Sequence, residues 1–566
     1  MAITAIFLVL ATLAALLLLV PVGRRAKSLP PGPPTRPFIG NLHQLPKTGA
    51  HYTCTRPVFP NARHSLTPDR FTEWARTYGG IFSLKLGPAT ALVITDRRLV
   101  KQLLDKKGNI YSNRPQSYVA HDLITGGDHL LVMQYGAKWR LFRRLIQNHF
   151  NETRCAHEHV ALVDAEAAQM IHDVMGAPED LMLHPKRFSN SIITSLVFGI
   201  RTPSVRTPHM LQLYDVMEKW SAVMETGATP PVDIFGFLKW VPESLLGRWK
   251  TRARDVNKLM VALYGGMVGR VIKRREAGHR TASFLDTVLD ATAVPGGSDG
   301  DGLALNENEL NFLAGVLMEG GSDTTASILL AFLQAMVKYP HVQQRAHAEI
   351  DALLGADATA LERSPRWDDY ARLPYVAQIV KETMRWRPVT PLGFPHATNA
   401  DDVVDGYTIP KGTTVLLNVW GLHHEQTSSA GTATEPLSPF AFNPDRFAGR
   451  TAPASTYAAS GDYAARDHYG YGAGRRLCPG IHLAERNLFV GVAKLLWAFT
   501  LSEKAGAAPV DVDPETGYSE GFLHCAKPFA CEVRVRGENE AARKRRREIV
   551  LAEFGKAKRI FEAFEV

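Results

Sequence analysis

One cysteine near the end of the chain lies in a glycine-rich segment that runs from Tyr471 to Gly480. The segment reads Tyr-Gly-Ala-Gly-Arg-Arg-Leu-Cys-Pro-Gly, so two cationic side chains precede the thiol of Cys478. Positive charge favours the thiolate, which is the form of cysteine that binds metal. The Gly-Lys-Ser/Thr ending of a phosphate-binding loop is absent, and no second Cys or His follows at zinc-site spacing. A single axial thiolate to a haem iron fits this pattern best.

This segment resembles the haem-binding loop of the cytochrome P450 family, with Cys478 as the axial ligand of the iron. Tyr471 stands where the family usually has Phe, so an aromatic ring is kept and a modest electronic change is expected. The resemblance implies the cytochrome P450 fold, which is mostly α-helical (α+β) with small β-sheets. It also implies haem b as the cofactor and electrons that come from NADPH through a reductase.

A long helix is predicted in the middle of the chain. Asn306 and Glu309 have the spacing of a helix start, and Pro340 marks the end, which gives a helix of roughly 30 residues. Its centre carries Gly320 and Gly321, each of which costs about 1 kcal/mol relative to Ala. We therefore expect either a close approach to the backbone or a locally open helix at this point.

The run Gly320–Thr325 on this helix, Gly-Gly-Ser-Asp-Thr-Thr, resembles the oxygen-binding groove of the same family. The resemblance implies that Asp323 and Thr324 are the acid–alcohol pair that delivers protons to the distal oxygen. Without Cys478 the same residues would indicate only Ser/Thr bonding to helix carbonyls.

A third match is Glu382-Thr-Met-Arg385, which resembles the E-x-x-R motif of the family. Both charged residues share one face of a helix predicted over Tyr375–Arg387. The segment around Phe442–Phe447 supplies Arg446 as the expected partner. The resemblance implies a structural cluster of Glu382, Arg385 and Arg446.

Haem propionates need cationic or donor groups within reach. By position in the family pattern, four residues resemble those partners: Trp139, Arg143, His396 and Arg476. Pocket walls are expected, also by position, from segments that are largely apolar and favour a hydrophobic substrate. These segments are Gln116–Leu130, Phe312–Glu319, Val389–Phe394 and Gly521–Leu523, with Gly227–Trp240 resembling a mobile lid beside the membrane.

Short strands are also predicted. Ile81–Leu86 and Thr90–Thr95 alternate around Gly87-Pro88 and indicate a hairpin. Strand-like segments at Tyr407–Ile409 and Thr413–Val419 flank a turn.

The N-terminus carries an apolar segment over residues 2–22, and about 20 such residues can span a bilayer as a helix. Arg24, Arg25 and Lys27 follow at once, so the remainder of the chain is expected on the cytosolic side. A cleaved signal peptide would need a basic start and a shorter apolar run. We predict a single-pass protein of the endoplasmic reticulum membrane, with its catalytic domain on the cytosolic face.

The predicted organisation places the haem-thiolate domain behind the anchor and a hinge. Residues 51–70 interrupt the resemblance and are either a lineage-specific loop or an error in the gene model. The divisions are 1–22 (transmembrane anchor), 23–37 (basic, Pro-rich hinge), 38–536 (monooxygenase domain, with 51–70 as a doubtful insertion) and 537–566 (basic amphipathic tail).

The tail has a basic run followed by apolar residues at helical spacing, including Val550, Phe554 and Phe561. Two interpretations are open: a helix docked on the body, which we favour, or an element that faces the membrane or a reductase. The net charge of +9 comes from three segments: this tail, the basic residues just after the apolar N-terminal segment, and the doubtful insertion. The remaining body is formally neutral, so no nucleic-acid partner is expected.

The predicted function is a haem-dependent monooxygenase that inserts one atom of O₂ into a small hydrophobic substrate. The sequence Pro391–His396 resembles that of P450 enzymes of fungal secondary metabolism. Among these the chain most resembles enzymes that hydroxylate polyketide-derived phenols of the m-cresol type. Expected partners are membrane lipid, NADPH–cytochrome P450 reductase and cytochrome b5. The alternatives are a thiolate-haem isomerase or dehydratase, which often lacks the acid–alcohol pair, and a non-catalytic haem-binding membrane protein.

Overall fold

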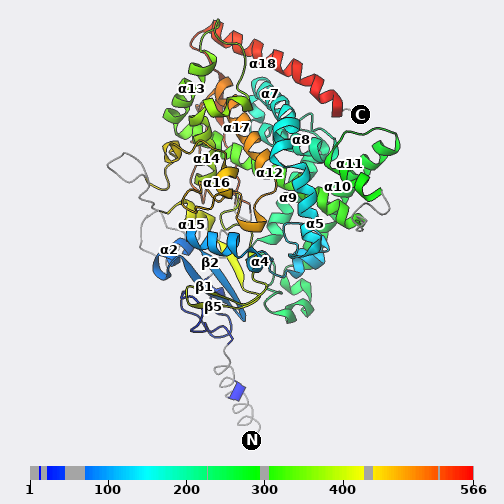
Figure 1. Cartoon of the computed structure of the whole chain (residues 1–566), viewed down its shortest axis with the longest axis vertical. Coiled ribbons are helices and arrows are strands. Elements are labelled where there is room, and N and C mark those ends of the chain that lie inside the picture. The colour runs from blue at the N-terminus through cyan, green and yellow to red at the C-terminus, as the bar shows by residue number, and fades with distance from the viewer. Residues whose placement is uncertain are drawn as a thin grey trace.

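The computed structural model describes residues 12–13, 22–44, 70–225, 227–293, 305–425, 438–519 and 523–564. Helices pack around the central helix α12 (Glu307–Lys338), and a small sheet lies at one end of the molecule (Figure 1). The other helices are α2 (Arg70–Tyr78), α3 (Arg97–Val100), α4 (Gly108–Tyr111), α5 (Ala137–His149), α6 (Glu152–Arg154), α7 (Val160–Gly176), α8 (His184–Phe198), α9 (Pro208–Met224), α10 (Trp249–Glu276), α11 (Phe284–Ala293), α13 (Pro340–Leu354), α14 (Pro374–Trp386), α15 (Val419–His423), α16 (Ala454–Ala459), α17 (Ile481–Ala498) and α18 (Glu540–Phe561). The strands are β1 (Ile81–Leu86), β2 (Ala89–Ile94), β3 (His396–Ala397), β4 (Asp402–Val404), β5 (Tyr407–Ile409), β6 (Thr414–Leu417), β7 (Phe499–Glu503) and β8 (Cys531–Val535).

Helix α12 begins and ends where the sequence predicts. The Asn306 side chain accepts the backbone N–H of Glu309 at 2.9 Å, and the Glu309 carboxylate accepts the N–H of Asn306 at 2.9 Å. This reciprocal pair satisfies two N–H groups that the first turn of a helix leaves without partners. The helix is 32 residues long and ends just before Pro340, which is the first residue of α13.

The main sheet has the strand order β1-β2-β6-β3. Strands β1 and β2 form the predicted antiparallel hairpin, and Gly87 at its turn has φ +59°. The segments on either side of Pro410–Gly412 do not pair with each other, because β5 pairs with β4 whereas β6 pairs with β2 and β3. Strand β6 stops at Leu417 because Asn418 caps the next helix by accepting the N–H of Gly421 at 3.0 Å.

The N-terminal part of the described chain is fixed to this sheet. The Arg25 guanidinium donates to Ser83 Oγ at 2.9 Å and to the Gly32 and Pro33 carbonyls at 2.8 Å each. The Ser83 N–H donates to the Pro31 carbonyl at 2.8 Å. The segment predicted as a hinge therefore lies along β1. Arg25, predicted as part of the basic flank of the apolar segment, also ties this segment to the sheet.

Two predicted features fall largely outside the described residues. They are the apolar segment 2–22, of which only residues 12, 13 and 22 are described, and the insertion 51–70, of which only Arg70 is. Within the described ranges, no helix has both the length and the apolar character needed to cross a membrane.

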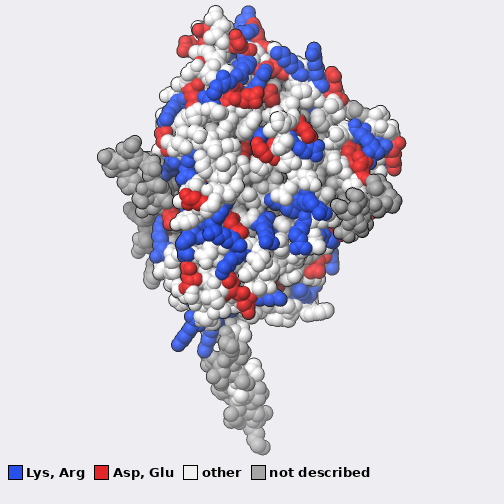
Figure 2. All heavy atoms as spheres, viewed as in Figure 1, with Lys and Arg blue, Asp and Glu red and all other residues white. Residues whose placement is uncertain are grey.

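The C-terminal helix α18 packs against α7. Ala557 and Phe561 form a buried cluster with Ala165 and Ala168, and Arg546 of the basic run is buried rather than exposed. The helix lies at the end of the molecule opposite residues 22–44 (Figure 1), and its surroundings carry both signs of charge (Figure 2). The structure therefore shows the docked arrangement of the tail.

Candidate active site

The loop that carries Cys478 has a shape that two glycines make possible. Gly472 and Gly474 have φ of +74° and +64°, and a Cβ on Gly474 would lie 2.1 Å from the Leu104 carbonyl oxygen. The backbone N–H of Cys478 donates to the Tyr471 carbonyl at 2.9 Å. Both positions favour glycine because left-handed backbone is costly for other residues, and at Gly474 no room exists for a side chain.

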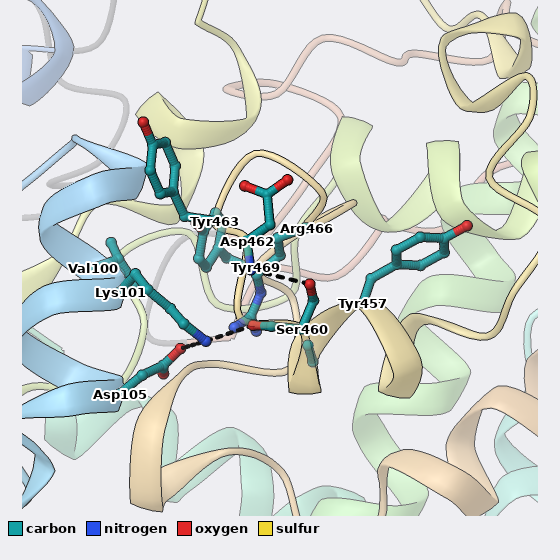
Figure 3. A pocket seen from close by; sticks show the side chains of 10 residues that line it. Val100, Lys101, Asp105, Tyr457, Ser460, Asp462, Tyr463, Arg466 and Tyr469 are labelled. Carbon is teal, nitrogen blue, oxygen red and sulfur yellow. Dashed lines mark hydrogen bonds and ion pairs between the residues drawn. The ribbon is translucent and has the colours of Figure 1, made fainter.

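A layer of polar contacts beneath the loop holds it in place. The Asp105 carboxylate accepts the backbone N–H of Gly474 at 2.7 Å and pairs with Lys101 Nζ at 3.0 Å. Figure 3 shows Lys101 extended between Asp105 and the Ser460 carbonyl, which it reaches at 2.6 Å, in a surface crevice that Arg466 also lines. Arg466 donates in turn to the Gly472 carbonyl.

The environment of the Cys478 thiol differs from the sequence-based expectation. Burial raises the pKa of this thiol, while the Gly480 backbone N–H and the Arg143 guanidinium lower it by less. Neither arginine of the loop lowers the pKa of the thiol, because Arg475 is exposed and donates to the Tyr135 hydroxyl, and Arg476 donates to backbone carbonyls. The cation that acts on the thiol is therefore Arg143.

Arg476 is held by backbone carbonyl oxygens of the segment between α4 and α5. It donates to the carbonyls of Ser112, Leu130 and Met133 at 2.9, 3.1 and 2.7 Å. Its guanidinium also lies 4.5 Å from the centroid of the Trp139 ring. The Trp139 Nε1–H is buried and has no hydrogen-bond partner among the described residues.

Arg114, which the sequence analysis missed, belongs to the same cluster. It is buried and donates to the Leu131 and Pro395 carbonyls at 2.8 and 2.7 Å. Burial lowers its pKa to about 9, and burial together with Arg114 and Arg143 lowers the pKa of Arg476 to about 8. In the described part of the chain, no carboxylate forms an ion pair with any of these three guanidinium groups. Such a cluster is suited to an anionic ligand.

His396 lies beside this cluster, and its predicted contact with a propionate stays a prediction. Its Nδ1 is 2.8 Å from the Tyr111 carbonyl oxygen, so the ring hydrogen on Nδ1 is already donated. Burial, with Arg114 and Arg476 adding to it, lowers the pKa of His396 to about 3. The imidazole is therefore neutral near pH 7, and its Nε2 can accept a hydrogen bond but not donate one.

The two central glycines of α12 do different things. A Cβ on Gly320 would meet no atom within 4 Å, whereas a Cβ on Gly321 would lie 2.5 Å from the Ile193 side chain of α8. Both reasons proposed for glycine therefore occur, one at each position. Gly320 is exposed although the helix as a whole is mostly buried, so this position of the helix is open.

The predicted acid–alcohol pair, Asp323 and Thr324, follows this open position on α12. Thr324 Oγ1 donates to the Gly320 carbonyl at 2.7 Å, one turn earlier. Burial raises the pKa of Asp323, Lys186 opposes that shift, and Glu319 adds to it. Both residues are placed on α12 as expected, and their part in proton delivery stays a prediction.

The sequence model of the family described as Cytochrome P450 matches residues 30–532. The chain belongs to the cytochrome P450 family. It is 52% identical over 543 residues to cytochrome P450 monooxygenase patI of Aspergillus clavatus, covering 96% of this chain and 94% of that protein. It is also 52% identical to cytochrome P450 monooxygenase yanC of Aspergillus niger, covering 94% of this chain and 93% of that one.

A solved P450 structure has the same fold. It is described as "Zebra fish cytochrome P450 another structure with Abiraterone", with a TM-score of 0.62 and 24% identity over 82% of this chain and 98% of that chain. With the fungal relatives, these comparisons show that the protein is a P450 monooxygenase. Members of this family hold a haem iron through a cysteine thiolate. Helix α18 begins after the last residue that the family model matches.

The residues of this P450 fit a haem group. Arg114, Arg143 and Arg476 gather positive charge that no carboxylate of the described residues neutralises, and two propionates could neutralise it. The unpartnered Trp139 Nε1–H offers a further donor. Cys478 would hold the iron on one side, with Gly320 as the open position of α12.

The structure also brings the E-x-x-R cluster of this P450 together. Arg385 Nε lies 2.6 Å from the Glu382 carboxylate, and Arg446 Nε lies 3.5 Å from it. Arg385 also donates to the carbonyls of His423 and Pro439 at 3.0 and 2.8 Å. The buried carboxylate therefore joins α14 to the segment before the cysteine loop.

The expected pocket walls are mostly buried and apolar where they are described, while residues 521–522 lie outside the described ranges. Sequence analysis missed one polar group in these walls. Glu319 Oε2 lies 3.0 Å from His129 Nε2, and the Tyr264 hydroxyl donates to Glu319 Oε1. The sequence does carry a signal for this group, because Glu319 is an acidic residue that directly follows the apolar run Phe312–Met318. A charge buried in such a run needs partners.

Proposed function

We propose that this P450 uses O₂ and electrons from NADPH to hydroxylate a small hydrophobic substrate, a polyketide-derived phenol of the m-cresol type. The observation that carries the proposal is the convergence of Cys478 with Arg143, which in turn lies close to Arg114 and Arg476. When bound, haem supplies oxygen binding and electron transfer at the iron.

The proposed work of the protein's own residues is to hold that group and to move protons. Arg114, Arg143, Arg476 and Trp139 would bind the propionates, and Cys478 would provide the thiolate that holds the iron. Asp323, whose pKa is raised by burial, would pass a proton toward the Thr324 hydroxyl, which donates to the carbonyl of the open position Gly320. The presence of both residues favours a monooxygenase over the isomerase and dehydratase alternatives.

The substrate class is supported by the lining of the walls and by the resemblance to fungal secondary-metabolism enzymes. Ile124, Leu130, Phe312, Leu317 and Val389 are buried apolar residues in the segments expected to form the pocket. Such walls favour a small apolar or aromatic molecule.

Electrons are proposed to come from a separate NADPH–cytochrome P450 reductase, with cytochrome b5 as an optional second donor. Arg475 is an exposed residue of the cysteine loop, and its guanidinium lies 5.5 Å from the Tyr135 ring centroid. The Arg140 guanidinium lies 5.8 Å from the same centroid. These two cations offer a surface beside the thiolate for an acidic redox partner.

The proposed location is the endoplasmic reticulum membrane, with the domain on the cytosolic face. Phe237, Trp240 and Leu245 are 65%, 88% and 76% exposed, and they follow Phe235, which contacts the hairpin turn at Gly87. These apolar side chains therefore lie at the same end as residues 22–44, where the apolar N-terminal segment joins the fold (Figure 1). Recovery of the full chain in carbonate-washed microsomes, with the domain open to added protease, would support this; recovery in the soluble fraction would refute it.

The activity is tested with the haem-loaded enzyme, a fungal reductase, NADPH and 3-methylphenol. We expect a hydroxylated product whose formation stops when O₂ is removed and which carries label from ¹⁸O₂. Product that forms without O₂ would overturn the monooxygenase proposal. For the ligand, Cys478→Ser should lose the red-shifted ferrous–CO Soret band, and a variant that kept this band would refute the role of Cys478.

A further inference from the structure

A single buried carboxylate joins three segments that lie far apart in the sequence. Glu319 of α12 bonds to His129, which lies in the loop before α5, and to Tyr264 of α10. The side chains of His129 and Glu319 are 1% and 5% exposed, and Tyr264 is fully buried. A buried carboxylate of this kind is costly unless its oxygens are satisfied, so the arrangement is specifically supported.

The backbone of α12 is shaped to admit the tyrosine. A Cβ on Gly315 would lie 2.4 Å from the Tyr264 ring, so the ring could not take its position beside any other residue. Gly315 is one helical turn before Glu319 and shares its face. The close approach at Gly315 therefore brings the Tyr264 hydroxyl to the carboxylate.

The hydrogen-bond directions around Glu319 follow from the contacts of the imidazole. The Leu131 backbone N–H donates to His129 Nδ1 at 3.3 Å, so Nδ1 is an acceptor and the hydrogen on Nε2 is donated to Glu319. The carboxylate thus receives two donors. A carboxylate has about four acceptor positions, so capacity for a further donor remains.

Aromatic rings surround this polar group. The His129 ring stacks on Trp220 with centroids 5.9 Å apart, and Phe312 meets both His129 and Tyr264 edge to face at 6.2 and 5.7 Å. Glu319 directly precedes the open position Gly320, and it is close enough to Asp323 to raise the pKa of that residue. The acceptor therefore lies beside the region where the reacting part of a substrate would be held.

We propose that Glu319 is the acceptor that recognises the hydroxyl group of a small aromatic substrate, with Tyr264 and His129 as positioning residues. This inference rests on the proposed function and names the chemical group that the same site selects. An ionised carboxylate accepts hydrogen bonds and repels anions, so a neutral phenol is preferred over its methyl ether, which has no donor, and over a carboxylic acid. The aromatic rings would pack against the substrate ring.

The test is a set of binding titrations on the haem-loaded enzyme, followed by the Soret shift. The probes are 3-methylphenol, 3-methylanisole and 3-methylbenzoate. We expect the wild type to bind the phenol at least about tenfold more tightly than the ether, which corresponds to one charge-assisted hydrogen bond. In Glu319→Gln this preference should fall to within about threefold, with ether affinity unchanged and benzoate discrimination reduced.

Tyr264→Phe keeps the ring against Gly315 and removes only the donor. It should lower the phenol-over-ether preference severalfold, and this variant decides the question if Glu319→Gln does not yield haem-loaded protein. The matched control is Tyr339→Phe. Tyr339 follows the last residue of α12, and its ring contacts Trp386 and Phe442 and not Glu319. This control should leave the preference unchanged.

Two outcomes would overturn the proposal. One is a Glu319→Gln or Tyr264→Phe enzyme that retains the phenol preference, and the other is an equal loss of phenol and ether affinity, which would make the network purely structural. Failure of the proposed function is separate, because it would be seen as O₂-independent product or no product in the wild type. The binding preference is measured without turnover and does not depend on that result.

Discussion

The guanidinium of Arg476 lies 4.5 Å from the centroid of the Trp139 indole ring, whereas the indole N–H has no partner within the described ranges. The face of the indole therefore packs on the arginine, and its polar edge is left available. A buried N–H without a partner carries a cost that a bound anion removes. The pair offers one stacked cation and one donor to the same ligand.

Trp139→Phe should keep the ring under Arg476 and remove the donor. Since a hydrogen bond to a charged group contributes about 1.5–3 kcal/mol, we expect haem to leave the variant at least about tenfold faster. The measurement is haem transfer to an excess of a scavenging apoprotein. Trp497→Phe is the control, because Trp497 also has an unpartnered Nε1 and lies 5.5 Å from a guanidinium, that of Arg546, but on the side of the fold where α18 docks. Equal haem loss in both variants would contradict the role of Trp139.

The two glycines of α12 should respond differently to alanine. Gly321→Ala places a Cβ 2.5 Å from Ile193, so it should lower the free energy of unfolding by about 1–3 kcal/mol. Gly320→Ala meets open space and should stabilise the folded chain by about 0.4–1 kcal/mol. Denaturant unfolding measures both values. In a double-mutant cycle, Gly321→Ala should cost less in an Ile193→Ala background, which lacks the Cγ1 atom 2.5 Å away, and an equal cost in both backgrounds would show that the contact is not the cause.

A pH dependence is expected from Glu485 on α17. Burial raises the pKa of this carboxyl to about 7, although it accepts the backbone N–H groups of Ala454 and Ser455. The pKa is higher in the folded state than in the unfolded state, so the protonated form stabilises the fold, and this contribution is lost as pH rises from about 4.5 to about 7.

Glu485→Gln should remove that dependence. At pH 8 the variant should gain up to about 3 kcal/mol in unfolding free energy relative to the wild type, and much less at pH 4.5. Thermal unfolding at several pH values measures the difference. A difference that does not change with pH would show that folding does not shift the pKa of this carboxyl.

The C-terminal helix should contribute to stability through a buried charge network. Lys494 is fully buried and pairs with Asp164 at 3.1 Å and with Glu553 of α18 at 3.3 Å. Glu553→Gln should cost about 2 kcal/mol, less than a wholly unpaired charge would, because Asp164 remains. Glu548→Gln, which removes an exposed charge from the same helix, should change stability by less than about 0.5 kcal/mol.

Removal of residues 537–566 extends the same test. The truncated protein should unfold at a lower temperature, while its partition into membranes should be unchanged. A truncation that altered partition and left stability intact would favour the membrane-facing interpretation of the tail.

The residues that could be predicted from sequence are those whose spacing itself carries the chemistry. Cys478 lies in a glycine-rich loop, and Asn306 and Pro340 bound a helix by local rules that need no tertiary information. The same holds for Glu382 and Arg385, which one helical turn brings together. The hairpin at Gly87 follows from alternation and a turn.

The residues that could not be predicted obtain their roles from distant parts of the chain. Arg114 reaches carbonyls of residues 280 and 281 positions later, and no local pattern marks it. Glu319 takes partners 190 and 55 positions away. His396 is near the expected position, but its hydrogen is donated to Tyr111, a contact that only tertiary packing defines.

The location of α18 has a consequence for protein engineering. The last described residues lie at the opposite end from residues 22–44 (Figure 1), and α18 is packed on α7 rather than extended from the body. A domain fused to the C-terminus would start at the end of the molecule opposite residues 22–44. A short rigid linker would therefore hold it away from that end, so a fused partner that must reach it needs a long flexible connection.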